Sequence, residues 1–248
     1  MPQDDPLYTD AALVAFYDVE NGWADDLAYC AGLARDARSV LDLGCGTGAF
    51  LAGIGAPERV GVDPATAMLD TARRRPGGAG VAWVEADARH VDIGRAFDLI
   101  VLTGHAFQVF LTEADQRAVL ATIARHLGPE GRFIFDSRNP TCREWEEWQN
   151  HNSRRVVEHP RHGRVTAWNT ADHDPATGIV TYETFYRLAD GRELSAASRI
   201  RFTPRDELAR LIAGAGLVVD NWLGDWSGRP FDAAAPEIIP IGRLANPR

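Results

Sequence analysis

A short strand that runs directly into a cluster of glycines constrains this chain more than any other feature. Residues 40–43 read Val-Leu-Asp-Leu, and the next five residues are Gly44, Cys45, Gly46, Thr47 and Gly48. Glycines at the end of a strand allow a tight turn and let a ligand approach the backbone. We call residues 44–48 the glycine turn, and the sequence predicts that it forms the floor of a ligand site.

The segments after Ser39 alternate between short apolar runs and stretches of helical period, the pattern of parallel strands joined by helices. The run Phe97–Leu102 is almost entirely apolar, which predicts a central strand buried on both faces. A helix that begins after Thr112 is expected to end at Gly128-Pro129. The five strands expected in this part of the chain are Val40–Leu43, Arg59–Val62, Val81–Val84, Phe97–Leu102 and Arg132–Asp136.

The pattern changes to period two between residues 154 and 202, with turn signals at 160–163, 175–178 and 190–191. This pattern predicts antiparallel strands. After one more helix, strands at 217–223 and 237–242 complete the sheet. The predicted fold class is α/β: a doubly wound, mainly parallel, seven-stranded sheet with an antiparallel β insertion between strand five and the last helix. The predicted domains are residues 1–150 with 203–248, and the insertion at 151–202.

Composition excludes several classes of protein. The formal net charge of −9 argues against a surface built to bind nucleic acid. The N-terminal residues Met1 to Pro6 are polar and acidic, unlike a signal peptide, and no apolar stretch approaches ~20 residues. Three cysteines without metal-ligand spacing predict free thiols and no metal site. We therefore expect a cytoplasmic protein without membrane contact.

The spacing of glycines and acids indicates an adenosine-containing cofactor. Gly44, Gly46 and Ala49 fit the dinucleotide fingerprint, and Asp63 lies where a ribose-binding acid belongs. The fingerprint alone fits a nicotinamide cofactor as well as other adenosine cofactors. Three further residues separate these cofactors: an acid inside the first strand, a third glycine, and a second acid after strand three. They are Asp42, Gly48 and Asp87.

With these residues in place, the region from Ser39 to Pro140 resembles the class I S-adenosylmethionine-dependent methyltransferases, which have a Rossmann-like fold. The resemblance implies that S-adenosylmethionine is the cofactor and S-adenosylhomocysteine the product. It implies methyl transfer to N or O of a small-molecule acceptor by in-line displacement. Because the sulfonium is already activated, placing the acceptor behind the methyl group is the main task of such an enzyme.

The resemblance also implies roles for individual residues. Asp42 and the glycine turn would face the methionine portion, Asp63 the ribose hydroxyls, and Asp87 with the Ala88 amide the adenine edge. A carboxylate suits these roles because it accepts several hydrogen bonds. Tyr17 belongs to a segment that in similar enzymes folds over the cofactor. The full expected cofactor-binding set is Tyr17, Asp42, Gly44, Cys45, Gly46, Thr47, Gly48, Asp63, Pro64, Met68, Asp87, Ala88 and Thr103.

Two residues are candidates for the acceptor side. His105 follows strand four, and its imidazole titrates near neutral pH, so it is either a general base or a residue hydrogen-bonded within its loop. Arg138 follows strand five and either clamps an acceptor carboxylate or forms a surface ion pair. Trp145 and Trp148, three residues apart, are expected to bury one face of a helix.

Three alternative functions remain open at this point: a tRNA or other RNA methyltransferase, a nicotinamide oxidoreductase, and a non-catalytic protein that binds S-adenosylmethionine. The acidic charge and modest length favour a small-molecule acceptor over nucleic acid. The assembly is expected to be a monomer or a homodimer.

Overall fold

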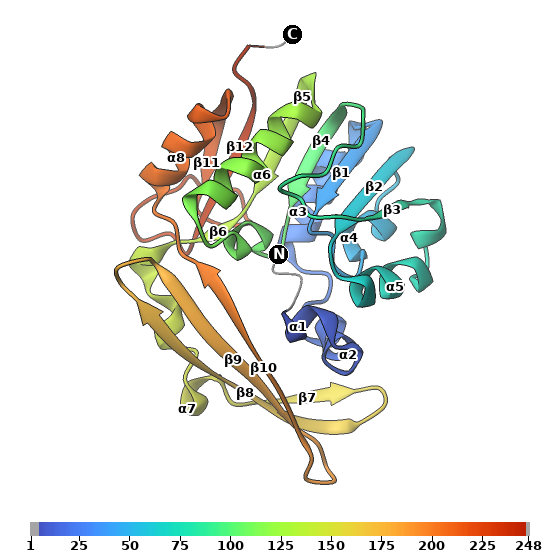
Figure 1. Ribbon diagram of the computed structural model, residues 1–248, viewed down its shortest axis with the longest axis vertical. Coiled ribbons are helices and arrows are strands. Elements are labelled where there is room, and N and C mark those ends of the chain that lie inside the picture. The colour runs from blue at the N-terminus through green and yellow to red at the C-terminus, as the bar shows by residue number, and fades with distance from the viewer. Residues whose placement is uncertain (1–4, 247–248) are drawn as a thin grey trace.

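The computed structural model describes residues 5–246, which form two sheets and the helices around them (Figure 1). Most of the polar segment from Met1 to Pro6 therefore lies outside the described residues. The larger sheet is mainly parallel, and the smaller one is antiparallel. The strands of the larger sheet are β1 (Ser39–Leu43), β2 (Glu58–Asp63), β3 (Ala82–Glu85), β4 (Phe97–Leu102), β5 (Leu127–Phe135), β6 (Ser137–Arg138), β11 (Leu217–Leu223) and β12 (Glu237–Leu244).

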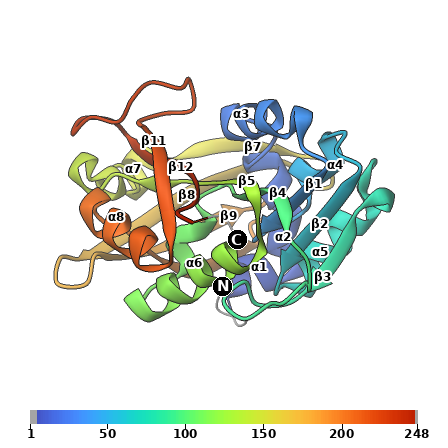
Figure 2. The same ribbon diagram turned by 90° about the horizontal axis from the view of Figure 1, so that it is seen from above.

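Helices cover both faces of the larger sheet, as Figure 2 shows from above. Leu27 of α3 and Phe50 of α4 pack on one face, whereas Leu120 of α6 and Leu211 of α8 pack on the other. The α-helices are α1 (Pro6–Thr9), α2 (Ala11–Glu20), α3 (Asp25–Leu33), α4 (Ala49–Gly53), α5 (Thr66–Arg74), α6 (Glu113–His126), α7 (Asn150–Ser153) and α8 (Arg205–Gly214). Short 3-10 helices are η1 (Ala34–Asp36), η2 (Gly78–Gly80), η3 (Ala106–Val109), η4 (Pro140–Cys142) and η5 (Glu144–Glu146).

The strand order places a ligand crevice at the glycine turn. The order is β11-β12-β5-β4-β1-β2-β3, with β6 paired to β12. The chain leaves β1 toward β2 on one side and later returns to β4 on the other side, so the strand order reverses between β1 and β4. Ligands of open α/β sheets bind at the carboxyl ends of the strands at such a point. The predicted central position of β4 is confirmed.

The predicted antiparallel strands form a separate four-stranded sheet in the order β10-β9-β8-β7. Figure 1 shows this sheet below the larger one, on the side of the glycine turn. Along β9 the side chains alternate: Val180 and Tyr186 are buried, whereas Thr181 and Arg187 are exposed. The strands are β7 (Arg155–His159), β8 (Gly163–Asp174), β9 (Ile179–Arg187) and β10 (Glu193–Arg201).

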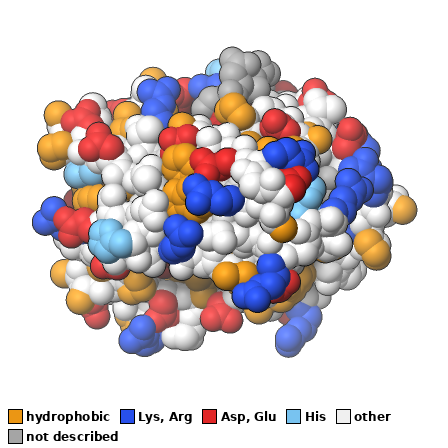
Figure 3. Space-filling view, turned by 90° about the horizontal axis from the view of Figure 1, so that it is seen from below, with side chains coloured by type: hydrophobic (Ala, Val, Ile, Leu, Met, Phe, Trp, Pro, Cys, Tyr) orange, Lys and Arg blue, Asp and Glu red, His pale blue; other side chains and the backbone are white. Residues whose placement is uncertain are grey.

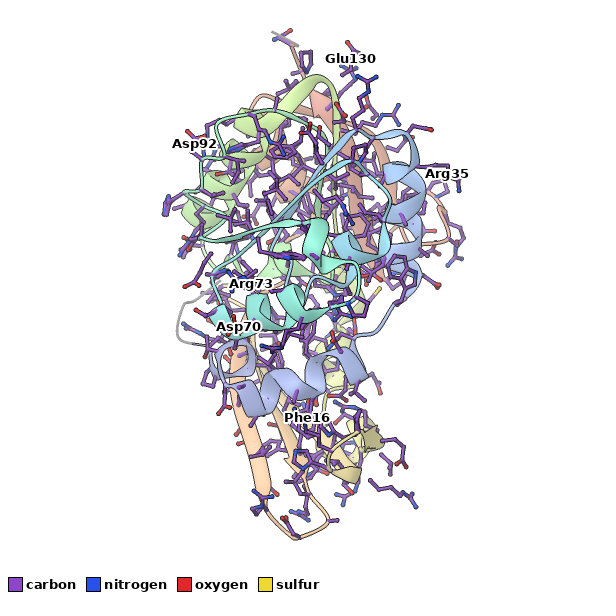
Figure 4. All side chains as sticks on the ribbon, turned by 90° about the vertical axis from the view of Figure 1, so that its right-hand side faces the viewer. Phe16, Arg35, Asp70, Arg73, Asp92 and Glu130 are labelled. Atoms are coloured by element: carbon purple, nitrogen blue, oxygen red, sulfur yellow. The ribbon has the colours of Figure 1, made fainter. Side chains whose placement is uncertain are left out.

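Residues 5–20, which we call the N-terminal bridge, connect the two sheets. Phe16 of α2 points toward the antiparallel sheet in Figure 4 and stacks on Tyr186, with 4.1 Å between ring centroids. On the other side, Asp18 accepts a 2.5 Å hydrogen bond from the Thr47 hydroxyl of the glycine turn. Arg75 adds a 2.5 Å ion pair to Asp18. The bridge therefore contacts the antiparallel sheet on one side and the glycine turn on the other.

Some local predictions were wrong. Helix α6 ends at His126, and Gly128-Pro129 lies inside β5, because Leu127 already pairs with Phe97 of β4. Trp145 and Trp148 do not share a helix face, since this segment forms only the 3-10 turn η5 and the bend after it. The predicted seven strands are present, and the two-residue strand β6 is an addition. Within residues 5–246, no helix is long and apolar enough to span a membrane.

Candidate active site

A cavity of about 770 Å³ lies between the glycine turn and the antiparallel sheet. Its walls come from the carboxyl ends of β1, β4 and β5, the N-terminal bridge, the start of α3, and strands β8 to β10. One half is bounded by the glycine turn and the other half by Tyr182 and Tyr186. We call these halves the donor half and the acceptor half. Their combined volume suits small ligands.

The glycine turn has the backbone geometry that its composition predicts. Gly44, Gly46 and Gly48 have φ angles of +83°, +51° and +73°, which residues with a Cβ rarely adopt. The amides of Gly44 and Cys45 both donate to the Val62 carbonyl of β2, which fixes the turn against the sheet. The turn therefore presents a rigid stretch of backbone to the donor half.

Asp63 stabilises this turn directly. Its side chain is fully buried and accepts hydrogen bonds of 2.9 Å from the amides of Gly46 and Ala65. Burial raises the pKa of Asp63 to about 6, against the lowering effect of these two amides. Asp63 is not among the residues that line the cavity. Its expected contact with ribose hydroxyls stays a prediction, and it requires the carboxylate to accept further hydrogen bonds.

Asp42 is the acid that faces the donor half. It lies on the β1 strand, is 2% exposed, and lines the cavity. Its Oδ1 atom has no hydrogen-bond partner among residues 5–246. Burial, together with the nearby carboxylates of Asp63 and Asp26, raises the pKa of Asp42 to about 8. A buried carboxylate without a partner is costly, so this position suits a cationic or hydrogen-bonding ligand.

The other predicted cofactor residues separate into two groups. Tyr17, Cys45, Thr47, Met68 and Thr103 line the cavity with Gly44 and Gly46. Gly48, Pro64, Asp87 and Ala88 do not.

Asp87 already has partners outside the cavity. Burial alone would raise its pKa, but hydrogen bonds from Arg89 lower it below the ordinary value. Arg89 in turn pairs with Asp115, at 2.6 Å. The expected adenine contacts of Asp87 and Ala88 stay predictions.

His105 belongs to a cluster at the boundary of the two halves. Its Nε2 atom lies 2.9 Å from Oε1 of Glu237 and 3.5 Å from Oδ2 of Asp136. Its backbone amide donates a 3.0 Å hydrogen bond to Oδ1 of Asp136. Burial and the nearby Arg138 lower the pKa of His105 to about 4, so the imidazole is neutral at pH 7. We call His105, Asp136 and Glu237 the proton cluster.

Arg138 lines the acceptor half but is engaged by neighbouring side chains. It donates a 3.0 Å hydrogen bond to Oε1 of Gln108 and forms a 3.0 Å ion pair with Glu144. Its guanidinium lies 5.0 Å from the ring centroid of Trp148. A clamp on an acceptor carboxylate stays a prediction for Arg138.

Several residues of the site were not predicted from the sequence. Asp26 lies in the first turn of α3, where an acid is common whether or not it serves a site. Glu237 begins β12 and looks like an ordinary strand-edge acid in the sequence. Period two could have indicated the inward-facing residues of the antiparallel strands. The missed lining residues are Glu20, Asp25, Asp26, Asp136, Trp148, Asn169, Tyr182, Thr184, Tyr186 and Glu237.

Comparison with known proteins identifies the class. Residues 40–131 match the family described as a methyltransferase domain. The cypemycin N-terminal methyltransferase of a Streptomyces species is 28% identical, over 96% of this chain and 98% of the relative. CcbJ, a methyltransferase from Streptomyces caelestis, has a TM-score of 0.74 at 23% identity, covering 93% of this chain and 96% of that one.

A further solved structure contains the bound cofactor. CalS10, an amino pentose methyltransferase from Micromonospora echinaspora with bound S-adenosylmethionine, has a TM-score of 0.71 at 25% identity, over 93% of this chain and 95% of that one. The protein is a class I S-adenosylmethionine-dependent methyltransferase. The predicted fold class and cofactor are thereby confirmed, and the nicotinamide alternative is removed.

The donor half of this methyltransferase fits its cofactor. S-Adenosylmethionine carries a positive sulfonium and a positive amino group, and it supplies an electrophilic methyl group when bound. Asp42 provides an unpaired buried oxygen, and the bare backbone of Gly46 lines the cavity beside the Tyr17 ring. Asp26 adds a further acid to the cavity wall. These residues would hold the amino acid portion of the cofactor.

Replacing Asp42 by asparagine is expected to weaken S-adenosylmethionine binding to the methyltransferase by about tenfold. The change keeps the shape of the side chain but removes the charge, and a charged hydrogen bond contributes ~1.5–3 kcal/mol. Isothermal titration calorimetry measures the effect. Replacement of the exposed Asp92 by asparagine is the control, and an unchanged affinity in Asp42→Asn would remove Asp42 from the cofactor site.

Proposed function

We propose that this methyltransferase transfers the methyl group of S-adenosylmethionine to the nitrogen of a small-molecule amine. The observation that carries the proposal is the acidic lining of the cavity. Among the described residues, its carboxyl groups are those of Glu20, Asp25, Asp26, Asp42, Asp136 and Glu237, whereas its arginines are Arg138 and Arg155 alone.

This charge distribution favours an amine over an anionic acceptor. An amine enters as an ammonium ion, which the acidic lining attracts, and it becomes nucleophilic after the loss of one proton. A carboxylate or a deprotonated hydroxyl would be repelled by the same lining. The two arginines are also neutralised locally, because Arg138 pairs with Glu144 and Arg155 with Glu20.

The related proteins support a nitrogen acceptor. One acts at the N-terminus of cypemycin, and another acts on an amino pentose. Both acceptors present an amino group. The four-stranded insertion, which we place at residues 151–202, would shape the acceptor half around such an amine, with the cofactor domain formed by residues 1–150 and 203–248.

No observation favours RNA as the acceptor. In the face shown in Figure 3, basic and acidic side chains are interspersed, and no continuous basic patch covers this view of the described residues. An RNA-binding face requires clustered positive charge. We place the enzyme in the cytoplasm, as a monomer or homodimer acting on small molecules.

A labelling experiment tests the function across many candidate acceptors at once. The protein is incubated with methyl-labelled S-adenosylmethionine and a fractionated metabolite extract, with half of each fraction first treated with an amine-acetylating reagent. We expect the labelled fraction to lose its label after acetylation, because acetylation removes the nucleophilic lone pair of the amine. Glucosamine and the peptide Ala-Ala-Ala serve as defined acceptors, with their N-acetylated forms as controls.

The same experiment distinguishes the alternatives. Label that survives amine acetylation would assign an oxygen or carbon acceptor and contradict the proposal. Label found only in added tRNA would assign an RNA methyltransferase. Binding of S-adenosylmethionine without transfer to any fraction would assign a non-catalytic binding protein.

A further inference from the structure

We infer that the proton cluster of His105, Asp136 and Glu237 binds the ammonium group of the acceptor and removes its proton before methyl transfer. The inference rests on the proposed function and deepens it, because it restricts the acceptor to aliphatic amines that are protonated at neutral pH. Three groups whose ligand atoms all lie within 4.8 Å of one another can surround one nitrogen.

Two unpaired oxygen atoms point to a ligand at this cluster. The Asp136 side chain is 1% exposed, and its Oδ2 atom has no hydrogen-bond partner in the described part of the chain. Within the same residues, Oε2 of Glu237 is also buried without a partner. Both residues line the cavity. Because a buried unsatisfied acceptor costs ~1–3 kcal/mol, two of them at one place suit a ligand that donates several hydrogen bonds, as an ammonium group does.

The cluster is held in place by unusual backbone geometry. His105 has a φ angle of +60°, in the left-handed region that few residues with a side chain adopt. The Asp136 carboxylate accepts the hydrogen bond from the His105 amide, and Asp136 follows β5 directly. Glu237 is fixed by the pairing of β12 with β6, in which it lies opposite Arg138. Three separate chain segments therefore converge on one point.

The charges around the cluster favour a cation. Asp26 contributes a further negative charge, and it raises the pKa of both Asp136 and Glu237. Arg138 is the nearby positive group that lowers the pKa of Glu237, and its own charge is balanced by Glu144. Burial raises the pKa of Asp136 to about 6 and that of Glu237 to about 7, so each can accept a proton near neutral pH.

Methyl transfer to the amine takes place in two steps, deprotonation and then displacement at the methyl carbon. The ammonium ion donates one proton to a carboxylate of the cluster and becomes a neutral amine. The lone pair of the nitrogen then forms a bond to the methyl carbon, while the carbon–sulfur bond breaks and its electron pair stays on sulfur. The product is a methylated ammonium ion, and the cluster later returns its proton to solvent. A hydrogen bond of 2.9 Å joins Nε2 of His105 to Oε1 of Glu237.

Paired probes test recognition of the ammonium group apart from turnover. Calorimetry with the intact chain and S-adenosylhomocysteine compares three amines with neutral counterparts of similar shape. The pairs are methylammonium with methanol, cyclohexylammonium with cyclohexanol, and Ala-Ala-Ala with its N-acetylated form. We expect at least one amine to bind about tenfold more tightly than its counterpart. If no amine exceeds its counterpart, the inference is overturned.

Two charge-removing variants locate this binding. Asp136→Asn and Glu237→Gln preserve side-chain shape, and each is expected to lower amine affinity by about tenfold to 100-fold, the range for one charged hydrogen bond. Affinity for S-adenosylmethionine should stay within about twofold of wild type, since the charged hydrogen bond being removed is not to the cofactor. Asp42→Asn is the matched variant. It should weaken S-adenosylmethionine binding and leave amine affinity near that of the wild type. Wild-type amine affinity in both cluster variants would overturn the inference.

Turnover separates this inference from the proposed function. With an amine acceptor from the labelling experiment, both variants should lower kcat/KM and shift its rise with pH. If both variants methylate an amine as well as the wild-type protein does, the proposed function stands and the inference fails. If label reaches only acceptors without an amine, both fail. Activity that is lost with EDTA and restored by Zn²⁺ or Mn²⁺ would assign the cluster to a metal instead.

Discussion

Replacing Gly46 by valine is expected to weaken S-adenosylmethionine binding at least about 100-fold, or ~3 kcal/mol. Gly46 has a φ angle of +51°, and the nearest atoms to a Cβ at this position belong to Tyr17, at 3.8 to 3.9 Å. A valine side chain would therefore fill the space between the turn and Tyr17. It would also strain the backbone that donates to Asp63. Calorimetric titration of the folded variant measures the loss.

Gly94 provides the matched control for this prediction. It also has a positive φ angle, +71°, but nothing lies within 4 Å of a Cβ there, and the residue is exposed. Gly94→Val therefore introduces comparable backbone strain far from the cavity. We expect a similar loss of stability in thermal unfolding but normal cofactor affinity. Equal affinity in the two variants would show that Gly46 does not border the cofactor.

Replacing Glu237 by glutamine is expected to stabilise the protein by about 3 kcal/mol at pH 8. Burial raises the pKa of Glu237 from 4.5 to about 7 in the folded chain. Between these pH values the folded state binds more protons than the unfolded state, so stability falls as the pH rises. Glutamine carries no charge and avoids this loss. The gain should shrink to about 1 kcal/mol at pH 5.5.

Urea unfolding at pH 8 and pH 5.5 measures this difference. Glu130→Gln is the control, because Glu130 is exposed at the far end of the larger sheet, as labelled in Figure 4. We expect no comparable gain from that variant. A destabilised Glu237→Gln protein at pH 8 would show that Glu237 is a structural hydrogen-bond partner and carries no cost of burial. If Glu237→Gln is more stable and less active than the wild type, Glu237 serves activity at a cost in stability.

The fold followed from the sequence where one local pattern determines one structure. Period two between residues 154 and 202 predicts strands because alternate side chains face opposite sides, and β7 to β10 lie there. The glycine turn was equally predictable, since three positive φ angles in five residues leave few alternatives to glycine. Gly128-Pro129 was misleading, because the pairing of Leu127 with Phe97 outweighs the local turn signal.

The site was less predictable because it depends on contacts between distant segments. His105 and Glu237 are 132 residues apart, and the pairing of β12 with β5 and β6 brings them together. Trp148 was assigned to a helix, yet the bend after η5 directs it to the cavity and to Arg138. A periodicity reports which face of its own element a residue occupies, and it does not report which other element lies opposite.

Because the N-terminal bridge lines the cavity and contacts both the glycine turn and the antiparallel sheet, we expect ligand binding in the two halves to be coupled. Asp18 bonds to the glycine turn through Thr47, and Glu20 pairs with Arg155 at the edge of the antiparallel sheet. A ligand that orders this segment from one side lowers the entropy cost of ordering it from the other. Linkage then requires reciprocity: by whatever factor the methyl donor tightens acceptor binding, the acceptor tightens donor binding.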